Sequence, residues 1–222
     1  MRACFFSLYM QEAKINFTYK ARYYQTSAIT AKTKRLIFVI HGYGQQAKYF
    51  IRKFEMLADE ETCIVAPEGL SRFYLEGFSG RVGATWMTKE DRLTDIENYL
   101  SYLSSIYRQL VADHTSLDIS VLGFSQGAAT ASRWVAYQDI PLSKLVLWAG
   151  IFPPDMDMEL AAERLRNKQV YYVYGLQDPF LNREKLDEMK QISDSLNIKP
   201  VKISFEGVHD IYETPLKQVF GR

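Results

Sequence analysis

Five consecutive residues carry the strongest sign of chemistry in this sequence: Gly123-Phe124-Ser125-Gln126-Gly127. They follow an apolar run at residues 119–122 that is typical of a strand, and they lead into a predicted helix at 126–137. A serine between glycines at such a junction lies on a sharp, strained turn that projects its hydroxyl from the sheet. About 0.04 matches to this pattern are expected by chance in a sequence of this composition. We therefore predict that Ser125 is a nucleophile; the alternative is a glycine-rich turn with an incidental serine.

A serine nucleophile needs a base, which is normally a histidine, and the chain has only three histidines. His114 precedes the run at 119–122, which is the wrong end of a parallel strand for a functional residue. His41 follows an apolar run, but it precedes the serine in the chain and lies in a glycine-rich loop. His209 follows the last apolar run, and we predict that it is the base; the alternative is a histidine in a surface loop.

The base needs a carboxylate that orients it, and the chain order typical of this arrangement is serine, then carboxylate, then histidine. Asp178 directly follows the apolar run at 170–174 and is the best candidate. The other carboxylates fit less well: Asp118 lies at the wrong strand end, Asp155 and Asp157 follow the preceding strand, and Glu206 and Asp210 lie too close to His209 in sequence. We predict a Ser125–His209–Asp178 triad.

The glycine-rich segment His41-Gly42-Tyr43-Gly44 follows the first long apolar run and suits a different task. A tetrahedral intermediate carries a negative oxygen, which backbone N–H groups stabilise. Where a serine nucleophile lies on a strand-to-helix turn, one such N–H group follows the nucleophile and another comes from a loop after an earlier strand. We predict that the amides of Gln126 and Tyr43 form this oxyanion hole, and that His41 shapes the turn.

The elements that must position these residues alternate along the chain. Solid apolar runs predict strands that are covered on both faces, at residues 36–40, 63–66, 119–122, 145–148, 170–174 and 201–205. Helices are predicted between them, near residues 47–59, 89–111, 126–137, 182–196 and 214–220. This alternation predicts an α/β fold with a mostly parallel sheet and helices on both faces. The predicted site residues all follow strands, at the edge where such sheets bind ligands.

The ends of elements give further expectations. Residues 3–10 and 15–24 are predicted to form two antiparallel strands at the N-terminal edge of the sheet. Thr88 and Asp91 resemble a capping box at the start of the helix near 89–111. The chain has no repeat and no linker-like stretch, so we expect one domain over residues 1–222, with room for only a minimal lid.

The composition excludes several classes of function. The net charge is +1, and this balance does not favour nucleic acid as a partner. Cys4 and Cys63 are the only cysteines and lack both a disulfide framework and metal-ligand spacing, so we expect no metal and no cofactor. No apolar run approaches the ~20 residues that span a bilayer. The run at 3–10 lacks a signal-peptide cleavage site, which favours a cytoplasmic protein. The oligomeric state is not indicated.

The motifs together resemble the phospholipase/carboxylesterase family of α/β-hydrolases, which includes acyl-protein thioesterases. The resemblance extends over about residues 34–215 and rests on four motifs in order: His41-Gly42-x-Gly44, Gly123-Phe124-Ser125-Gln126-Gly127, Gly175-x-x-Asp178-Pro179 and Gly207-x-His209. Two departures concern substrate choice. Gly42-Tyr43-Gly44-Gln45 stands where the family usually has Gly-Leu-Gly-Asp, and Gly127-Ala128-Ala129 stands where it usually has Gly-Gly-Ala.

The resemblance implies a serine hydrolase of the carboxylesterase or thioesterase type, in the 3.1 enzyme class. It would cleave esters or acyl thioesters of small soluble substrates through an acyl-enzyme intermediate. The aromatic side chains of Phe78, Trp86, Trp148 and Phe152 are candidates for an apolar acyl pocket; ordinary packing is the alternative. Two other functions stay open: a peptidase or lipase on the same fold, and a non-catalytic binding protein.

Overall fold

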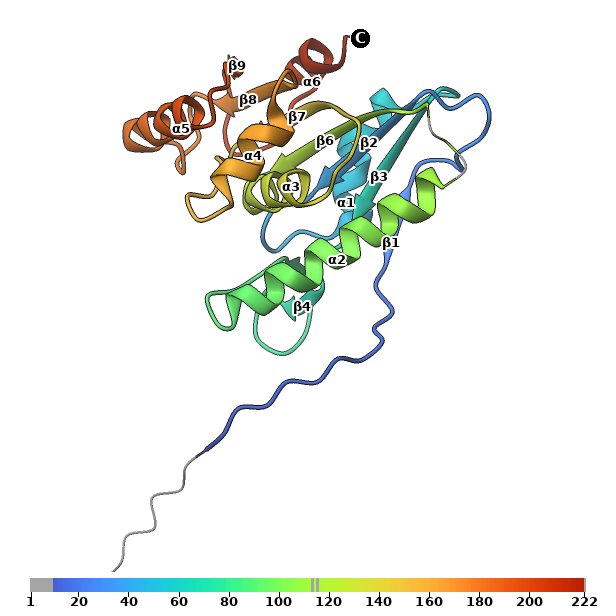
Figure 1. The fold of residues 1–222 in the computed structure, drawn as a ribbon, viewed down its shortest axis with the longest axis vertical. Helices are drawn as coiled ribbons and strands as arrows, with labels where there is room; N and C mark the ends of the chain where they lie inside the picture. The colour runs from blue at the N-terminus through green and yellow to red at the C-terminus, as the bar shows by residue number, and fades with distance from the viewer. Residues whose placement is uncertain (1–9, 113, 115, 222) are drawn as a thin grey trace, which may run out of the picture.

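A seven-stranded sheet forms the centre of the molecule in the computed structural model, which describes residues 10–112, 114 and 116–221 (Figure 1). The strand order across the sheet is β1-β3-β2-β6-β7-β8-β9. These strands are β1 (Tyr23–Gln25), β2 (Arg35–Ile40), β3 (Thr62–Pro67), β6 (Asp118–Phe124), β7 (Leu142–Trp148), β8 (Gln169–Gly175) and β9 (Val201–Phe205). All neighbours pair in parallel except β1, which is antiparallel to β3. The predicted fold class, an α/β-hydrolase fold with a mostly parallel sheet, is confirmed.

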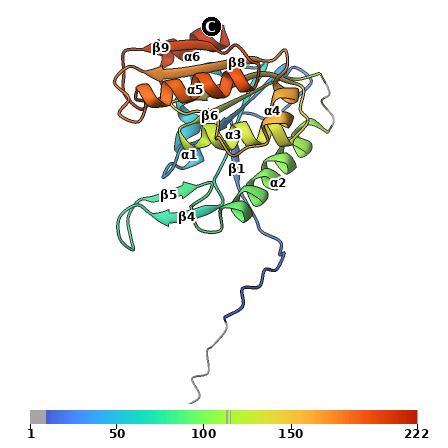
Figure 2. The same cartoon turned by 60° about the vertical axis from the view of Figure 1, so that its left-hand side comes forward.

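Helices cover both faces of the sheet, as predicted. In the described residues they are α1 (Ala47–Phe50), the 3₁₀ helix η1 (Ile51–Leu57), α2 (Arg92–Val111), α3 (Gln126–Tyr137), α4 (Met158–Leu165), α5 (Arg183–Ser195) and α6 (Glu213–Phe220). Figure 2 shows α2, α3, α4 and α5 together on one face. The two faces have separate hydrophobic clusters because successive strand residues point to opposite sides. In β2, for example, Phe38 joins the cluster under α2 and α3, whereas Val39 joins the cluster under α1 and α6.

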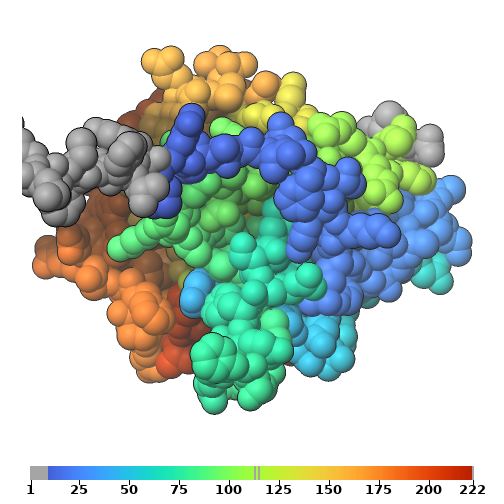
Figure 3. All heavy atoms as spheres, turned by 90° about the horizontal axis from the view of Figure 1, so that it is seen from below, coloured from blue at the N-terminus to red at the C-terminus, as the bar shows by residue number. Residues whose placement is uncertain are grey.

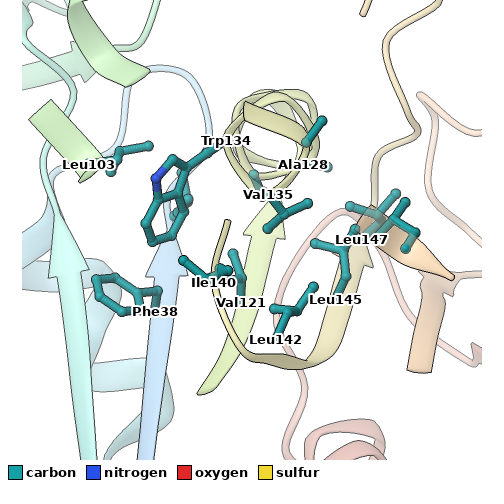
Figure 4. Packing of buried hydrophobic residues seen from close by; sticks show 14 of the residues in the cluster. Phe38, Leu103, Val121, Ala128, Trp134, Val135, Ile140, Leu142, Leu145 and Leu147 are labelled. Atoms are coloured by element: carbon teal, nitrogen blue, oxygen red, sulfur yellow. The ribbon is translucent and has the colours of Figure 1, made fainter. Parts of the chain in front are cut away.

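The larger cluster packs α3 against the middle of the sheet (Figure 4). Trp134 of α3 is fully buried, and its ring lies 5.0 Å from the ring of Phe38 in β2. Leu103 of α2 and Leu145 of β7 are buried in the same cluster. Because α3 begins directly after Ser125, this packing fixes the position of the helix that follows the predicted nucleophile.

The N-terminal segment departs from the prediction. Of the predicted strand at 15–24, only Tyr23 and Tyr24 belong to a strand, β1; residues 10–22 belong to none and run away from the sheet (Figure 1). Just before β1, Arg22 contacts Glu68 twice: its side chain pairs with the carboxylate at 2.6 Å, and its carbonyl accepts the Glu68 amide at 3.3 Å. The other predicted strand, at residues 3–10, lies almost wholly outside the described residues.

Two local features were not predicted, and one local prediction is wrong. The connection at 70–88 contains a hairpin, β4 (Ser71–Tyr74) and β5 (Val82–Thr85), which lies apart from the main sheet (Figure 2). Helix α4 lies within the connection between β7 and β8. The predicted capping box is wrong, because the helix begins at Arg92, so that Asp91 rather than Thr88 is its N-cap, and Asp91 makes no capping hydrogen bond. Its carboxylate instead accepts hydrogen bonds from Lys14 and Thr94.

Within the described residues, no helix is both long enough and apolar enough to cross a membrane.

Candidate active site

Ser125 lies between β6 and α3 in a strained backbone conformation, with φ 55° and ψ −118°. Such a positive φ is costly for a residue other than glycine and persists only where the surroundings impose it. Two backbone bonds hold the turn: the amide of Ser125 donates to the carbonyl of Trp148 at 2.9 Å, and Ala128 N–H donates to the carbonyl of Ser125 at 2.9 Å. This is the geometry that the pentapeptide predicts, with a serine on a sharp strand-to-helix turn.

The glycines of the pentapeptide are required by close backbone contacts. A Cβ on Gly123 would lie 2.2 Å from the carbonyl oxygen of Gly127, and a Cβ on Gly127 would lie 2.2 Å from that of Ile40. Gly150, after β7, is equally confined, since its Cβ would lie 2.7 Å from the carbonyl oxygen of Ser125. The turn therefore packs directly against the ends of β2 and β7.

His209 and Asp178 are joined by a hydrogen bond of 2.7 Å between Nδ1 and Oδ2. The Asp178 side chain is fully buried, and its other oxygen accepts the amide of Phe180 at 2.9 Å. A carboxylate accepts at Nδ1, so His209 donates from this nitrogen and keeps Nε2 as an acceptor. The structure therefore brings together the two residues predicted as base and orienting carboxylate.

His209 also lies beside the turn that carries Ser125. Its ring centroid is 4.8 Å from that of Phe124, the residue directly before Ser125, and 4.8 Å from that of Phe180. The loop that carries His209 is anchored from two sides. Trp148 Nε1 donates to the carbonyl of Asp210 at 2.9 Å, and Gln177 N–H donates to the carbonyl of Gly207 at 3.0 Å.

The loop at 41–45 reaches the same place. A Cβ on Gly42 would lie 3.2 Å from the Cβ of Ser125. The amide of Gly42 donates to Gln45 Oε1 at 2.9 Å, which folds the loop back on itself. Tyr43 follows with its side chain exposed, and its ring centroid lies 5.2 Å from that of Phe73 in β4. Gln126 is the first residue of α3, and the amide of the first residue of a helix has no acceptor within the helix.

Gln126 has a side-chain role that the sequence did not indicate. Its Oε1 accepts from the hydroxyl of Thr85 at 3.0 Å and from the amide of Trp86 at 3.2 Å, and its Nε2 donates to the carbonyl of Met87 at 2.9 Å. The side chain thereby ties the end of β5 to the serine turn. The sequence shows only that a glutamine follows the serine. It does not show this bonding role, because the partners of the side chain lie about 40 residues earlier in the chain.

His41 is fully buried and structural in its contacts. Its Nδ1 donates to the carbonyl of Gly42 at 2.7 Å, and its Nε2 accepts the amide of Gly69 at 3.0 Å. Burial lowers the pKa of His41 to about 4, so the ring is neutral near neutral pH. Both ring nitrogens are occupied by backbone groups, which agrees with the predicted role in shaping the turn.

The four aromatic residues predicted to line an acyl pocket are not gathered around one. Trp86, Trp148 and Phe152 are each at most 2% exposed and are packed in the core. Two of them are held by contacts unrelated to a pocket: Trp86 Nε1 donates to the carbonyl of His41, and Trp148 Nε1 to that of Asp210. Phe78 is 97% exposed at the tip of the hairpin. The alternative, ordinary packing, describes the three buried rings.

Figure 3 shows the surface of the molecule from below. In this view the β4–β5 hairpin (teal) lies beside segments near the C-terminus (orange and red). Within residues 10–112, 114 and 116–221, no three side chains of His, Cys, Asp or Glu are grouped so that they could hold a metal ion.

A family comparison decides the classification. The family model described as phospholipase/carboxylesterase matches residues 23–220, which is nearly the whole chain. The chain belongs to this family. The predicted resemblance is thus confirmed, and membership supports an ester-hydrolysing enzyme of the esterase or thioesterase type. None of the curated proteins matches the chain.

Solved structures share the fold of this phospholipase/carboxylesterase relative at low sequence identity. Esterase PE8 is 19% identical with a TM-score of 0.68, and the match covers 91% of this chain and 97% of that one. Acyl-protein thioesterase 2 from Zea mays is 18% identical with the same TM-score and coverage. A phospholipase/carboxylesterase from Dyadobacter fermentans DSM 18053 is 18% identical with a TM-score of 0.65, covering 93% and 97%. At these identities the likeness shows the fold alone.

Proposed function

We propose that this chain is a serine hydrolase that cleaves carboxylic esters or acyl thioesters of small soluble substrates through an acyl-enzyme intermediate. The observation that carries the proposal is the 2.7 Å hydrogen bond from His209 to the buried Asp178, beside the strained turn of Ser125. A nucleophile, a base and a group that orients the base are the parts that acyl transfer needs.

In the first step, His209 Nε2 accepts the proton of Ser125 Oγ as this oxygen attacks the substrate carbonyl carbon. Asp178 holds the imidazole in the required tautomer and stabilises the imidazolium that forms. The negative oxygen of the tetrahedral intermediate lies between the amides of Tyr43 and Gln126, and α3 contributes the positive end of its dipole.

The intermediate then collapses, and the protonated His209 gives its proton to the leaving alcohol or thiol. Water attacks the acyl-enzyme in the second half of the reaction, with His209 again acting as the base. The product acid leaves and Ser125 is restored. No step requires a metal ion or a cofactor. We expect a cytoplasmic enzyme that acts on small molecules, since the net charge of +1 favours neither nucleic acid nor a charged membrane surface as a partner.

A fluorophosphonate probe tests the nucleophile directly, because it labels only an activated serine. We expect labelling of the wild-type protein and none of Ser125→Ala, with Ser132→Ala as the matched control that labels normally. Labelling that persists in Ser125→Ala would contradict the assignment of the nucleophile. The absence of labelling in wild type would favour a non-catalytic binding protein.

A substrate panel separates the proposal from other enzymes on this fold. We expect turnover of short-chain p-nitrophenyl esters and of acyl thioesters, lost in Ser125→Ala. Turnover of peptides or triglycerides, with short esters left intact, would instead indicate a peptidase or a lipase.

A further inference from the structure

A cleft of about 670 Å³ lies beside the loop that approaches Ser125. One wall comes from residues 44–53 and the other from residues 75–82 of the hairpin. Gly42, two residues before the wall begins, comes close to the Ser125 side chain. The volume falls in the range of small-molecule sites. The loop that contacts the serine turn therefore continues directly into one wall of the cleft.

The lining of the cleft is cationic. Three basic side chains contribute to it, Lys48, Lys53 and Arg81, and none of the described residues that line it is Asp or Glu. The whole chain has a net charge of only +1, so this concentration of positive charge is local. Charge of one sign in a recess raises the local concentration of ligands of the opposite sign.

Two of these charges are available to a ligand. Lys48 Nζ lies 4.6 Å from the ring centroid of Tyr49, a contact that positions the ammonium without neutralising it. No carboxylate in the described part of the chain forms an ion pair with Lys48. Arg81 pairs with Glu76 at 3.4 Å, but both side chains are at least 80% exposed. Pairs this exposed are weak and readily exchanged for another partner.

The third charge connects the cleft to the triad. Lys53 Nζ donates to Asp210 Oδ1 at 2.7 Å, and Asp210 directly follows His209. One residue of the cleft lining is thereby bonded to the loop that carries His209. Apolar side chains such as Tyr49, Leu75 and Val82 also line the cleft, so that a short hydrocarbon chain can lie between the reacting carbonyl and a distant charge.

We propose that the cleft makes this enzyme selective for esters or thioesters that carry an anionic group, with the anion held by Lys48 and Arg81. The inference rests on the proposed function, since it concerns the substrate of the same site. The anion can be a carboxylate or a phosphate-like group, and it can belong to the acyl part or to the leaving group. The shared requirement is a negative charge separated from the carbonyl by a few atoms.

Matched substrate pairs test this selectivity. On the acyl side, mono-p-nitrophenyl glutarate is compared with the neutral p-nitrophenyl pentanoate, and p-nitrophenyl 4-phosphonobutanoate distinguishes a phosphate-like anion from a carboxylate. On the leaving-group side, S-acetyl-3-mercaptopropionate is compared with S-propyl thioacetate. For wild type we expect kcat/KM to favour the anionic member of at least one pair by about tenfold at low ionic strength. The preference should decline as salt is added.

Two double variants locate the effect. In Lys48→Gln/Arg81→Gln the ratio of kcat/KM for the anionic member to kcat/KM for the neutral member of each pair should fall to about one. The matched control is Lys32→Gln/Lys34→Gln, which also removes two positive charges. These two exposed lysines precede β2 in the chain and form ion pairs with Glu60 and Glu61. The control should keep the wild-type preference.

The outcomes separate the two proposals. A wild-type enzyme that hydrolyses neutral esters through Ser125 but favours no anionic substrate overturns the cleft proposal and leaves the proposed function intact. A preference that the Lys48/Arg81 variant retains, or that the control variant also loses, overturns it as well. Absence of Ser125-dependent turnover of every ester and thioester overturns the proposed function itself. If the cleft variant fails to fold, the salt dependence of the wild-type preference decides: a preference that salt does not weaken contradicts the proposal.

Discussion

Two histidines near the serine turn have opposite environments, and these environments separate their roles. His41 is enclosed by backbone groups at both ring nitrogens and is held neutral. His209 is partly exposed, has a carboxylate at Nδ1 and keeps Nε2 as an acceptor. Only the second arrangement suits a group that must accept and release a proton during each turnover.

Replacing Asp178 by Asn should lower kcat by about 10³–10⁴-fold, because the amide favours the wrong tautomer of His209. Asn keeps an oxygen for the amide of Phe180, so the melting temperature should change little. Steady-state kinetics with p-nitrophenyl butyrate measures the effect. Asp155→Asn is the matched control: its carboxylate bonds to Arg133 at 2.6 Å instead of to a histidine, and kcat should stay within a few-fold. A mild effect of Asp178→Asn would mean that another carboxylate orients the base.

His41 should make stability depend on pH in acid. Its pKa is about 4 in the folded chain, against 6.5 for an unperturbed histidine. Between these values the unfolded chain binds a proton that the folded chain does not, so the free energy of unfolding falls as pH falls from 6.5 to 4. The loss amounts to about 3 kcal/mol for a shift of this size.

Urea unfolding of wild type and His41→Gln at pH 7 and pH 4.5 measures this contribution. The variant should be less stable than wild type at pH 7, and the gap should narrow in acid. His114→Gln, outside the buried loop, should follow the wild-type curve. Parallel curves for wild type and His41→Gln would show that His41 does not titrate between these pH values.

At the scale of elements, the predicted bounds of helices and strands were most accurate where a strong hydrophobic pattern was bounded by a glycine turn. Helix α3 was predicted at residues 126–137 and has those bounds, since the glycine turn fixes its start. The strand at 201–205 is equally close to prediction. Patterns without burial misled: residues 15–24 alternate like a strand, yet Ile15 and Phe17 are 87% and 78% exposed and have no strand partner. Alternation shows which face a strand would bury, but it does not show whether a neighbouring strand exists.

Contacts between distant segments explain what the sequence did not predict at the site. The Gln126 side chain bonds to Thr85 and Met87, and the cleft is lined by residues from two segments about 30 positions apart. The places of Ser125, Asp178 and His209 could be predicted because each lies in the loop after an apolar run, and parallel strands end at one edge of the sheet. Pocket residues follow no such rule, which is why Trp148 was predicted to face a ligand but lies in the core.

The serine turn depends on glycine for steric reasons. In Gly123→Ala the added Cβ would lie 2.2 Å from the carbonyl oxygen of Gly127, so the turn must open. We expect a loss of more than about 3 kcal/mol in unfolding free energy and loss of esterase activity. Gly77→Ala is the control, since nothing lies within 4 Å of its Cβ and only its φ of +58° is strained. It should cost about 1–2 kcal/mol and leave activity intact. Thermal melts and esterase assays of both variants measure the difference; equal effects would contradict the steric argument.

At the scale of the whole molecule, one sheet has two roles: its strands lead into the loops of the candidate site, and it separates the two hydrophobic clusters. Strands β2, β6, β8 and β9 lead into the loops of Gly42, Ser125, Asp178 and His209. Their parallel alignment brings loops more than 160 residues apart to one edge. Successive residues of these strands point alternately into the two hydrophobic clusters. The clusters on the two faces are therefore joined through the same strands.

This shared sheet predicts that the chain unfolds as one cooperative unit, as expected for a single domain. Phe54 of η1 and Leu103 of α2 are both fully buried, but they lie in different clusters on opposite faces. Phe54→Ala should cost about 3–5 kcal/mol and Leu103→Ala about 2–5 kcal/mol. Each should shift a single transition that circular dichroism and tryptophan fluorescence report at the same midpoint. Lys32→Gln, at an exposed position, should leave the midpoint unchanged. Two transitions, each shifted by only one of the substitutions, would show that the faces fold as separate units and would contradict the single domain.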